Sequence, residues 1–145
     1  MLSEHKIIIQ DLIELVWNGG RLAALDEICQ PAIRYYSPYA PGTLVGLEGL
    51  KQWISTVRTA FPDLIVELDG YLVAEGEQVA GRWTATGTQL YPIGQLPASG
   101  RMITISGLGI CRFVDDRLAE INIQYDVRSL LQQLGALHEL SEPVG

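Results

Sequence analysis

The spacing of apolar residues along the chain changes near Pro62. Before this proline, apolar side chains recur every three or four positions in residues 3–17 and 47–61, which predicts amphipathic helices. Beyond it, apolar and polar residues alternate, which predicts strands over residues 64–74, 79–89, 102–114 and 118–126. Helices followed by a run of strands are typical of α+β proteins with an antiparallel sheet. Such a sheet twists and curls, so we expect the amino-terminal helices to pack on its hollow face and to enclose a cavity.

The segment between the two long helices is predicted to be less regular. A short helix over residues 22–28 is expected to end at Pro31, because the residue before a proline is disfavoured in the α conformation. An extended segment follows over residues 32–36, and the prolines and glycines of residues 37–46 predict a loop.

Size, composition and charge limit the classes of function. We expect the 145 residues to form one domain, residues 1–145, and the 48% hydrophobic and 19% charged residues suit a globular protein. The net charge of -7 argues against nucleic acid or an anionic membrane as a partner, because both attract basic surfaces. No apolar stretch reaches membrane-spanning length and the first residues do not resemble a signal peptide, so we expect a cytoplasmic protein.

The cysteines and histidines do not have the spacing of a metal site. Cys29 and Cys111 are far apart and have no neighbouring histidine, so two buried free thiols are expected. His5 and His138 lie near opposite ends of the chain. We therefore expect no metal.

Asp126 lies where the last predicted strand gives way to a short helix that ends near Gly135. One interpretation makes Asp126 the N-cap of this helix, since aspartate is a favoured capping residue. The other makes it a carboxylate that faces a cavity and transfers protons.

The last hairpin yields a specific register. With Asp115-Asp116 as a two-residue turn, Val114 pairs with Arg117. The pairs that follow from this register are Cys111 with Glu120, Gly109 with Asn122, Gly107 with Gln124, and Ile105 with Asp126. Glycines opposite amides would leave empty volume, as in the floor of a pocket.

Two other arrangements of this hairpin are open. The opposite face carries Leu108, Ile110, Ile121, Ile123 and Tyr125. The usual rule sends the apolar face to the core and the polar face to water. Alternatively, a partner subunit covers the apolar face, which would make the protein a homo-oligomer, most simply a dimer. A slip of one residue would exchange the two faces.

Six segments in order resemble the SnoaL-like polyketide cyclases, a branch of the NTF2-like superfamily of cone-shaped α+β domains. They are VWNGG at residues 16–20, GLEGLKQWI at 46–54, AFPDL at 60–64, VAGRWTATGT at 79–88, SGLGICRF at 106–113 and YDVRSLLQQLG at 125–135. The resemblance covers most of the chain and implies that fold, with helices packed on a curled sheet around a pocket.

The resemblance also implies an activity, a cofactor-independent cyclisation of a hydrophobic polyketide ester by intramolecular aldol closure. The carboxylate that the family places at the end of the last strand corresponds to Asp126, the expected general acid/base. An apolar cavity disfavours the charged form of a carboxyl group, which suits an aspartate that exchanges protons near neutral pH.

Several positions that line the pocket in relatives differ here. Relatives often carry histidines where this chain has Tyr36 and Gln89, and a tryptophan where it has Asn122. With Gln124, these residues are candidates for binding a small hydrophobic molecule by hydrogen bonds. Trp53 is a further candidate for the cavity wall, although a tryptophan at helical spacing is also typical of a core.

Two alternative functions belong to the same superfamily. One is a hydrophobic ligand-binding protein without catalysis, consistent with the missing histidines. The other is an epoxide hydrolase, which requires a second carboxylate and an arginine beside a water.

Overall fold

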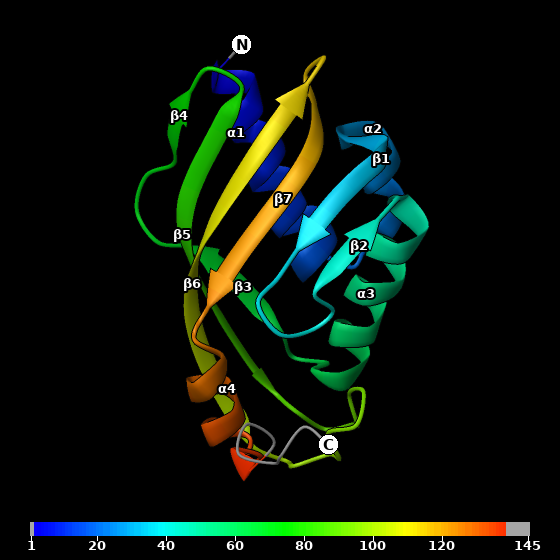
Figure 1. Ribbon diagram of the computed structural model, residues 1–145, viewed down its shortest axis with the longest axis vertical. Helices are drawn as coiled ribbons and strands as arrows, with labels where there is room; N and C mark the ends of the chain where they lie inside the picture. The colour runs from blue at the N-terminus through cyan, green and yellow to red at the C-terminus, as the bar shows by residue number, and fades with distance from the viewer. Residues whose placement is uncertain (1, 139–145) are drawn as a thin grey trace.

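The computed structural model describes residues 2–138, and they form a mixed α+β structure in which helices cover a curled, unclosed sheet (Figure 1). Helix α1 (Leu2–Asp11) continues directly as a π-helical segment, η1 (Leu12–Asn18), where one long helix was predicted. A short turn, η2 (Leu22–Ala24), leads into α2 (Leu25–Ile28), and α3 spans Leu47–Ala60. The α+β class predicted from the change in apolar spacing is confirmed.

The strands form one sheet of order β2-β1-β7-β6-β5-β3, with β4 paired to β5 beside this path. Their bounds are β1 Cys29–Tyr36, β2 Thr43–Val45, β3 Ile65–Leu68, β4 Val73–Glu75, β5 Gln78–Thr88, β6 Met102–Val114 and β7 Arg117–Tyr125. The expectation of an antiparallel sheet is wrong for one pair, because β1 and β7 run parallel. These two strands are far apart in sequence, so no hairpin dictates their relative direction.

Two other strand predictions differ from the structure. The strand expected over residues 64–74 is divided into β3 and β4, which pair with successive parts of β5. Gly70, at a φ of 86°, lies in the turn between them. Within the expected loop, β2 pairs with β1.

The β6–β7 hairpin has the predicted turn but not the predicted register. Asp115 and Asp116 adopt φ values of 51° and 61°, as a two-residue turn of type I′ requires, and Val114 pairs with Arg117. Phe113 then pairs with Leu118, whereas Arg112 pairs with Glu120, so Ala119 is an extra residue on β7. This bulge shifts every later pair by one position and exchanges the two faces of β7.

The exchange decides which side chains face the interior. The four predicted pairs from Cys111–Glu120 to Ile105–Asp126 are therefore wrong, and the observed pairs include Cys111 with Ile121, Gly109 with Ile123 and Gly107 with Tyr125. These β7 side chains turn toward the helices. Leu108 and Ile110, expected on the same face as Ile121, lie on the opposite, outer face and are exposed.

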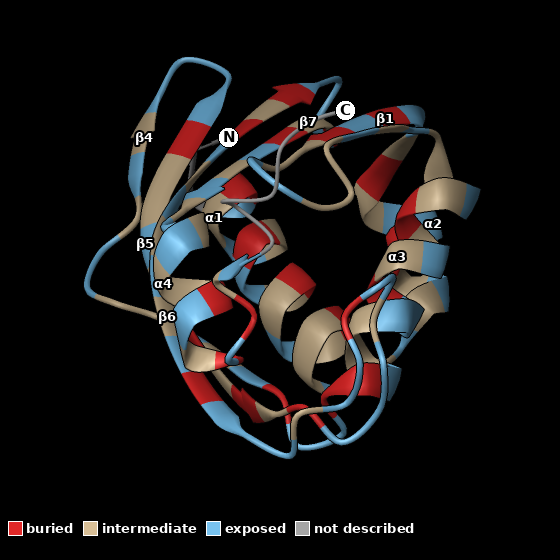
Figure 2. Cartoon of the chain, turned by 60° about the horizontal axis from the view of Figure 1, so that its bottom comes forward, coloured by how far each residue is buried: buried red, intermediate tan, exposed pale blue. Residues whose placement is uncertain are grey.

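The buried side chains form two clusters that face a common interior between sheet and helices (Figure 2). One includes Leu12 and Leu50 and lies toward the amino-terminal helices; the other includes Phe61 and Leu131 and lies toward α4 (Val127–Gln133). Trp17 packs against both. No helix in the described part of the chain is long and apolar enough to cross a membrane.

Candidate functional site

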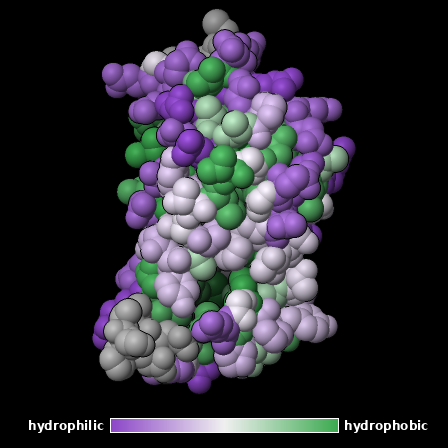
Figure 3. Space-filling view, turned by 45° about the vertical axis from the view of Figure 1, so that its right-hand side comes forward, coloured by the Kyte–Doolittle hydropathy of each residue, from purple (hydrophilic) through white to green (hydrophobic). Residues whose placement is uncertain are grey.

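A cavity of about 410 Å³ lies between the sheet and the helices. This volume is within the range of about 300–1,000 Å³ that is usual for small-molecule sites. Its walls come from α1, η1, α3, α4, the concave face of the sheet and residues 93–96. In the space-filling view an opening in the lower half of the molecule leads into a hydrophobic interior (Figure 3).

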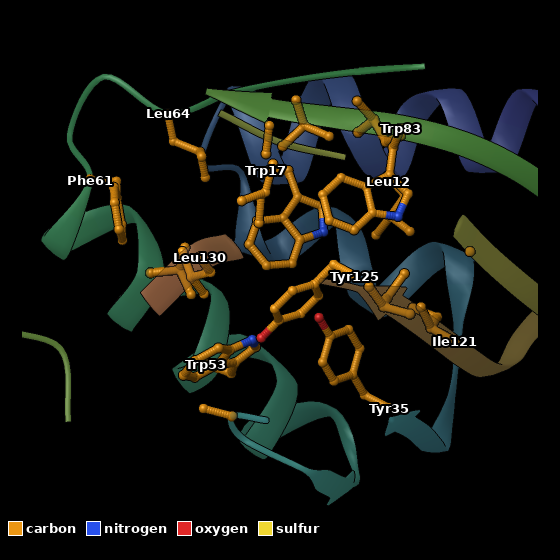
Figure 4. A pocket seen from close by; sticks show the side chains of 18 of the residues that line it. Leu12, Trp17, Tyr35, Trp53, Phe61, Leu64, Trp83, Ile121, Tyr125 and Leu130 are labelled. Carbon is orange, nitrogen blue, oxygen red and sulfur yellow. The ribbon is translucent and has the colours of Figure 1, made fainter. Parts of the chain in front are cut away.

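Aromatic side chains from five different elements gather in the cavity (Figure 4). They are Trp17 from η1, Tyr35 from β1, Trp53 from α3, Trp83 from β5 and Tyr125 from β7. The rings of Trp83 and Tyr125 meet edge to face, with their centroids 6.3 Å apart and an angle of 70° between their planes. Such rings present apolar surface and a few polar atoms at fixed positions.

The two inward tyrosines are neutral hydrogen-bonding groups. Burial raises the pKa of Tyr35 well above its usual value, and a hydrogen bond with the side chain of Trp53 acts in the opposite direction. Burial likewise raises the pKa of Tyr125, against a smaller effect of a hydrogen bond with the backbone of Ala40. Both phenols therefore keep their protons near neutral pH and can donate a hydrogen bond to a ligand.

The described part of the cavity wall is uncharged. No aspartate, glutamate, histidine, lysine or arginine is found among the described residues that line it. Transfer of an unpaired charge into such surroundings is unfavourable. The site therefore suits an uncharged ligand.

Cys111 lines the cavity but is not prepared for nucleophilic chemistry. Burial raises the pKa of the Cys111 thiol to about 12, and Cys29 adds to this effect. A thiol must lose its proton to act as a nucleophile. Both cysteines are buried and free, as predicted.

Of the predicted binding residues, Trp53 lies in the cavity wall. Tyr36 and Asn122 pair across β1 and β7 with their side chains on the outer face of the sheet, and Gln124 follows two positions after Asn122. Gln124 Nε2 donates to Asn122 Oδ1 at 3.1 Å, and both amides are exposed. The placement of these three side chains in the pocket is wrong, because the bulge at Ala119 exchanges the faces of β7 and β1 follows its register.

Gln89 is fully buried, and it is not among the described residues that line the cavity. Its Oε1 accepts a hydrogen bond of 3.2 Å from the backbone N–H of Ser99, within the link from β5 to β6. Gln89 thus ties this link to the end of β5.

Asp126 has the geometry of an N-cap. It is exposed, and Oδ1 accepts a hydrogen bond of 3.0 Å from the backbone N–H of Ser129. Tyr125 before it and Leu130 after it line the cavity, whereas Asp126 is not among the described lining residues. The expected withdrawal of this carboxylate from water is wrong; its role as general acid/base stays a prediction.

Sequence reasoning missed Tyr35, Tyr125 and Trp17 as residues of the cavity. The alternation of apolar and polar residues indicated an inward position for two of them, since Tyr35 follows Ile33 at a spacing of two and Tyr125 follows Ile121 and Ile123. For β7, the rule that an apolar face turns inward was the correct guide. Trp17 belongs to the apolar stripe of the helix predicted over residues 3–17, and nothing else in the sequence indicated that it lines the cavity.

The described residues contain no group of three or more histidine, cysteine, aspartate or glutamate side chains that could hold a metal ion. The polar atoms of the cavity belong to phenol, indole, amide and thiol groups. These groups suit hydrogen bonding to an organic ligand.

Comparison with known proteins identifies a family. The model of the SnoaL-like polyketide cyclase family matches residues 7–134. No curated protein sequence matches the chain.

Solved structures share the fold over nearly the whole chain. TsrD from Streptomyces laurentii is 30% identical, with a TM-score of 0.82 and coverage of 93% of this chain and 97% of that one. A protein from Acidithiobacillus ferrooxidans, provisionally named a polyketide cyclase, is 31% identical, with a TM-score of 0.77 and coverage of 92% and 95%. A provisionally named SnoaL-like polyketide cyclase from Jannaschia is 20% identical, with a TM-score of 0.84 and coverage of 92% and 93%, a likeness of fold alone.

Proposed function

This chain belongs to the SnoaL-like polyketide cyclase family, and we propose that it binds an uncharged, hydrophobic carbonyl compound in its cavity and promotes ring closure of that compound. The observation that carries the proposal is the cavity of about 410 Å³, whose described wall has aromatic and aliphatic side chains and no charged group. A flexible chain held in such a space loses most of its unproductive conformations before reaction. Holding reacting groups together can supply a large part of a rate enhancement.

The polar atoms of the wall support a role in carbonyl activation. An aldol closure builds negative charge on a carbonyl oxygen, and a fixed donor that meets this oxygen stabilises the transition state. Tyr35 and Tyr125 keep their protons because burial raises the pKa of each. They are therefore suited to donate to that oxygen and poorly suited to remove a proton.

A base for this ring closure is not found among the described residues that line the cavity. Asp126, the expected general acid/base, follows Tyr125 directly but caps α4 at the surface. We therefore assign confinement and hydrogen-bond donation to the cavity, and treat proton transfer by Asp126 as a separate hypothesis that its own variant tests.

A non-catalytic binding protein is the second candidate. It is favoured by the absence of any carboxylate or histidine among the described lining residues, since acid/base catalysis most often uses these groups. The epoxide hydrolase alternative lacks support, because the described wall holds neither the carboxylates nor the arginine that it requires.

A pair of variants on β6 tests the proposal. Ile105→Trp places a large ring in the cavity, whereas Leu108→Trp makes the same type of change on the outer face. A synthetic linear β-ketoester with a second, remote ketone serves as substrate, with binding measured by calorimetry and ring closure by chromatography. We expect the wild type and Leu108→Trp to bind and cyclise it, and Ile105→Trp to lose at least tenfold in both, because the ring occupies the ligand's space.

Three results are distinguishable. Binding without acceleration of ring closure would support the non-catalytic candidate. Equal behaviour of Ile105→Trp and Leu108→Trp would show that the cavity is not the site. Failure of the wild type to bind any uncharged ketone would overturn the proposal.

A further inference from the structure

The cavity follows a long stretch of the β5–β6 pair. Its lining residues on β6 run from Ile103 to Cys111, which spans about 26 Å at the usual rise of about 3.3 Å per residue. A cavity of about 410 Å³ that follows this stretch can hold an extended chain along the strands.

Trp83 lies at the middle of this stretch. It pairs with Gly107 across the sheet, and lining pairs are found on both sides, Val79 with Cys111 and Ala85 with Ile105. The two buried clusters lie on either side of Trp83 along the β5–β6 pair. Leu12, Cys111 and Ile121 lie in the cluster on one side, whereas Phe61, Ile105 and Leu130 belong to the cluster on the other.

Gly107 on β6 makes the position of the indole possible. A β-carbon there would lie 2.6 Å from Cζ2 of Trp83 and 2.9 Å from Cε2, and it would also overlap the backbone oxygen of Gln124, so no larger residue fits beneath the ring. A β-carbon on Gly109 would lie 3.9 Å from Cδ1 of the same ring. The indole therefore lies over Gly107 and leaves room for a β-carbon on Gly109, and these two positions form a glycine shelf beside the ring.

No polar anchor holds the ring on this shelf. Nε1 of Trp83 is buried and has no hydrogen-bond partner among the described residues. An unpaired buried donor is unfavourable, so the ring is retained by packing, including its edge-to-face contact with Tyr125. A large side chain midway along the cavity wall, held by packing, is suited to limit how far a ligand enters.

From these contacts we propose that Trp83 is a specificity-determining residue that limits how deeply a linear, uncharged chain enters the cavity. In this proposal Trp83 divides the single cavity into an outer chamber, lined by Phe61, Ile105 and Leu130, and an inner chamber, lined by Leu12, Cys111 and Ile121. The opening in Figure 3 lies in the lower half of the molecule, at the end where α4 lies in Figure 1, so a ligand meets the outer chamber first. This inference rests on the proposed function, because it takes the cavity as the ligand site.

A series of methyl ketones from octanone to hexadecanone tests the proposal by calorimetry. For the wild type, each added methylene should tighten binding roughly three- to fourfold until the chain fills the outer chamber, and affinity should then level off. Trp83→Ala should move this levelling-off to longer ketones and tighten hexadecanone binding at least tenfold, while octanone binding changes by no more than about twofold. Leu108→Ala, on the outer face of β6, is the control and should reproduce the wild-type series.

Trp83→Leu keeps an apolar side chain on the glycine shelf and repeats the test with less loss of packing. Thermal unfolding of each variant establishes that it is folded before titration. If binding levels off at the same chain length in the wild type, Trp83→Ala and Trp83→Leu, the proposal is overturned while the cavity remains the ligand site. If no ketone binds to the wild type, the proposed function fails first and this inference fails with it.

Discussion

The backbone N–H of Ser129 donates a hydrogen bond of 3.0 Å to Oδ1 of Asp126, so the carboxylate that follows β7 caps helix α4. The Asp126 side chain is exposed, although Tyr125 immediately before it and Leu130 in α4 both line the cavity. One residue can thus satisfy a helix terminus at the surface while its neighbour provides a phenol to the interior. Capping and catalysis can be separated here by the choice of substitution.

Asparagine is also a good cap, whereas alanine is not. We expect Asp126→Asn to keep wild-type stability and ligand affinity, and Asp126→Ala to lose about 1 kcal/mol of unfolding free energy in urea titrations. Under the confinement mechanism, Asp126→Asn should cyclise the β-ketoester within about threefold of the wild type. A loss of a hundredfold or more with unchanged affinity would instead establish Asp126 as the acid/base.

Tyr125 provides a test of carbonyl activation. Tyr125→Phe removes the inward hydroxyl and keeps the ring that meets Trp83 edge to face. We expect kcat for ring closure to fall about tenfold, the effect of one hydrogen bond of about 1.4 kcal/mol, with KM nearly constant. The matched control is Tyr36→Phe, the same change on the outer face of β1. Equal kinetics in the two variants would assign the Tyr125 hydroxyl no part in the reaction.

Asp116 should make stability depend on pH in the acid range. Its hydrogen bond with His5, 2.9 Å from Oδ1 to Nε2, is the main cause of a pKa lowered from the usual 3.8. A carboxyl group with a lowered pKa binds fewer protons in the folded state, so its contribution is present above about pH 4 and is lost as the pH falls through the lowered pKa. In urea unfolding, wild type and Asp116→Asn should differ more at about pH 5 than at about pH 2.5. A difference that grows on acidification would contradict this assignment.

Exposed apolar residues on the outer face of the sheet predict that the protein forms a homodimer. Leu108 and Ile110 are 55% and 50% exposed on neighbouring positions of this face of β6, and Met102, farther along the same face, is 68% exposed. Exposed apolar groups that lie together on a sheet often mark an interface. We therefore expect a homodimer in sedimentation equilibrium at micromolar concentration, and a monomer for Ile110→Lys.

The control for assembly is Tyr71→Lys, which adds the same charge at a residue that is 96% exposed in the turn between β3 and β4. It should remain dimeric. A wild-type protein that sediments as a monomer would contradict the prediction that the outer face is a dimer interface.

Several features of the fold could be predicted because they depend on local interactions. The α+β order follows from the change in apolar spacing, the two-residue turn from Asp115-Asp116, and the α4 cap from an aspartate at a strand-to-helix junction. The parallel pairing of β1 with β7 could not be predicted in the same way, since these strands are separated by most of the chain and meet only when the sheet assembles.

The residues of the candidate site depend on strand pairing between distant parts of the chain, which the sequence did not predict correctly. Trp53 lies in the wall, whereas Asn122 and Gln124 were placed inside because the hairpin register was extended without interruption from its turn, and Tyr36 was placed there because of the family resemblance. One extra residue, Ala119, reverses that assignment and brings Tyr125 inward. Its neighbours in sequence give no sign of it, because a bulge is stabilised by how the whole sheet curls around the helices.

By itself, then, the sequence determined the order of the main helices and strands, where the hairpin turns, and that the domain has ample apolar surface to bury. Those properties arise from side-chain spacing and turn conformations within a few residues of each other. Only the tertiary structure decided which face of β7 meets the interior, that the cavity wall described here is uncharged, and that Trp83 lies over Gly107 at its midpoint. The physical reason is that side chains alternate across a strand, so a single long-range shift in pairing changes every residue that a ligand can touch.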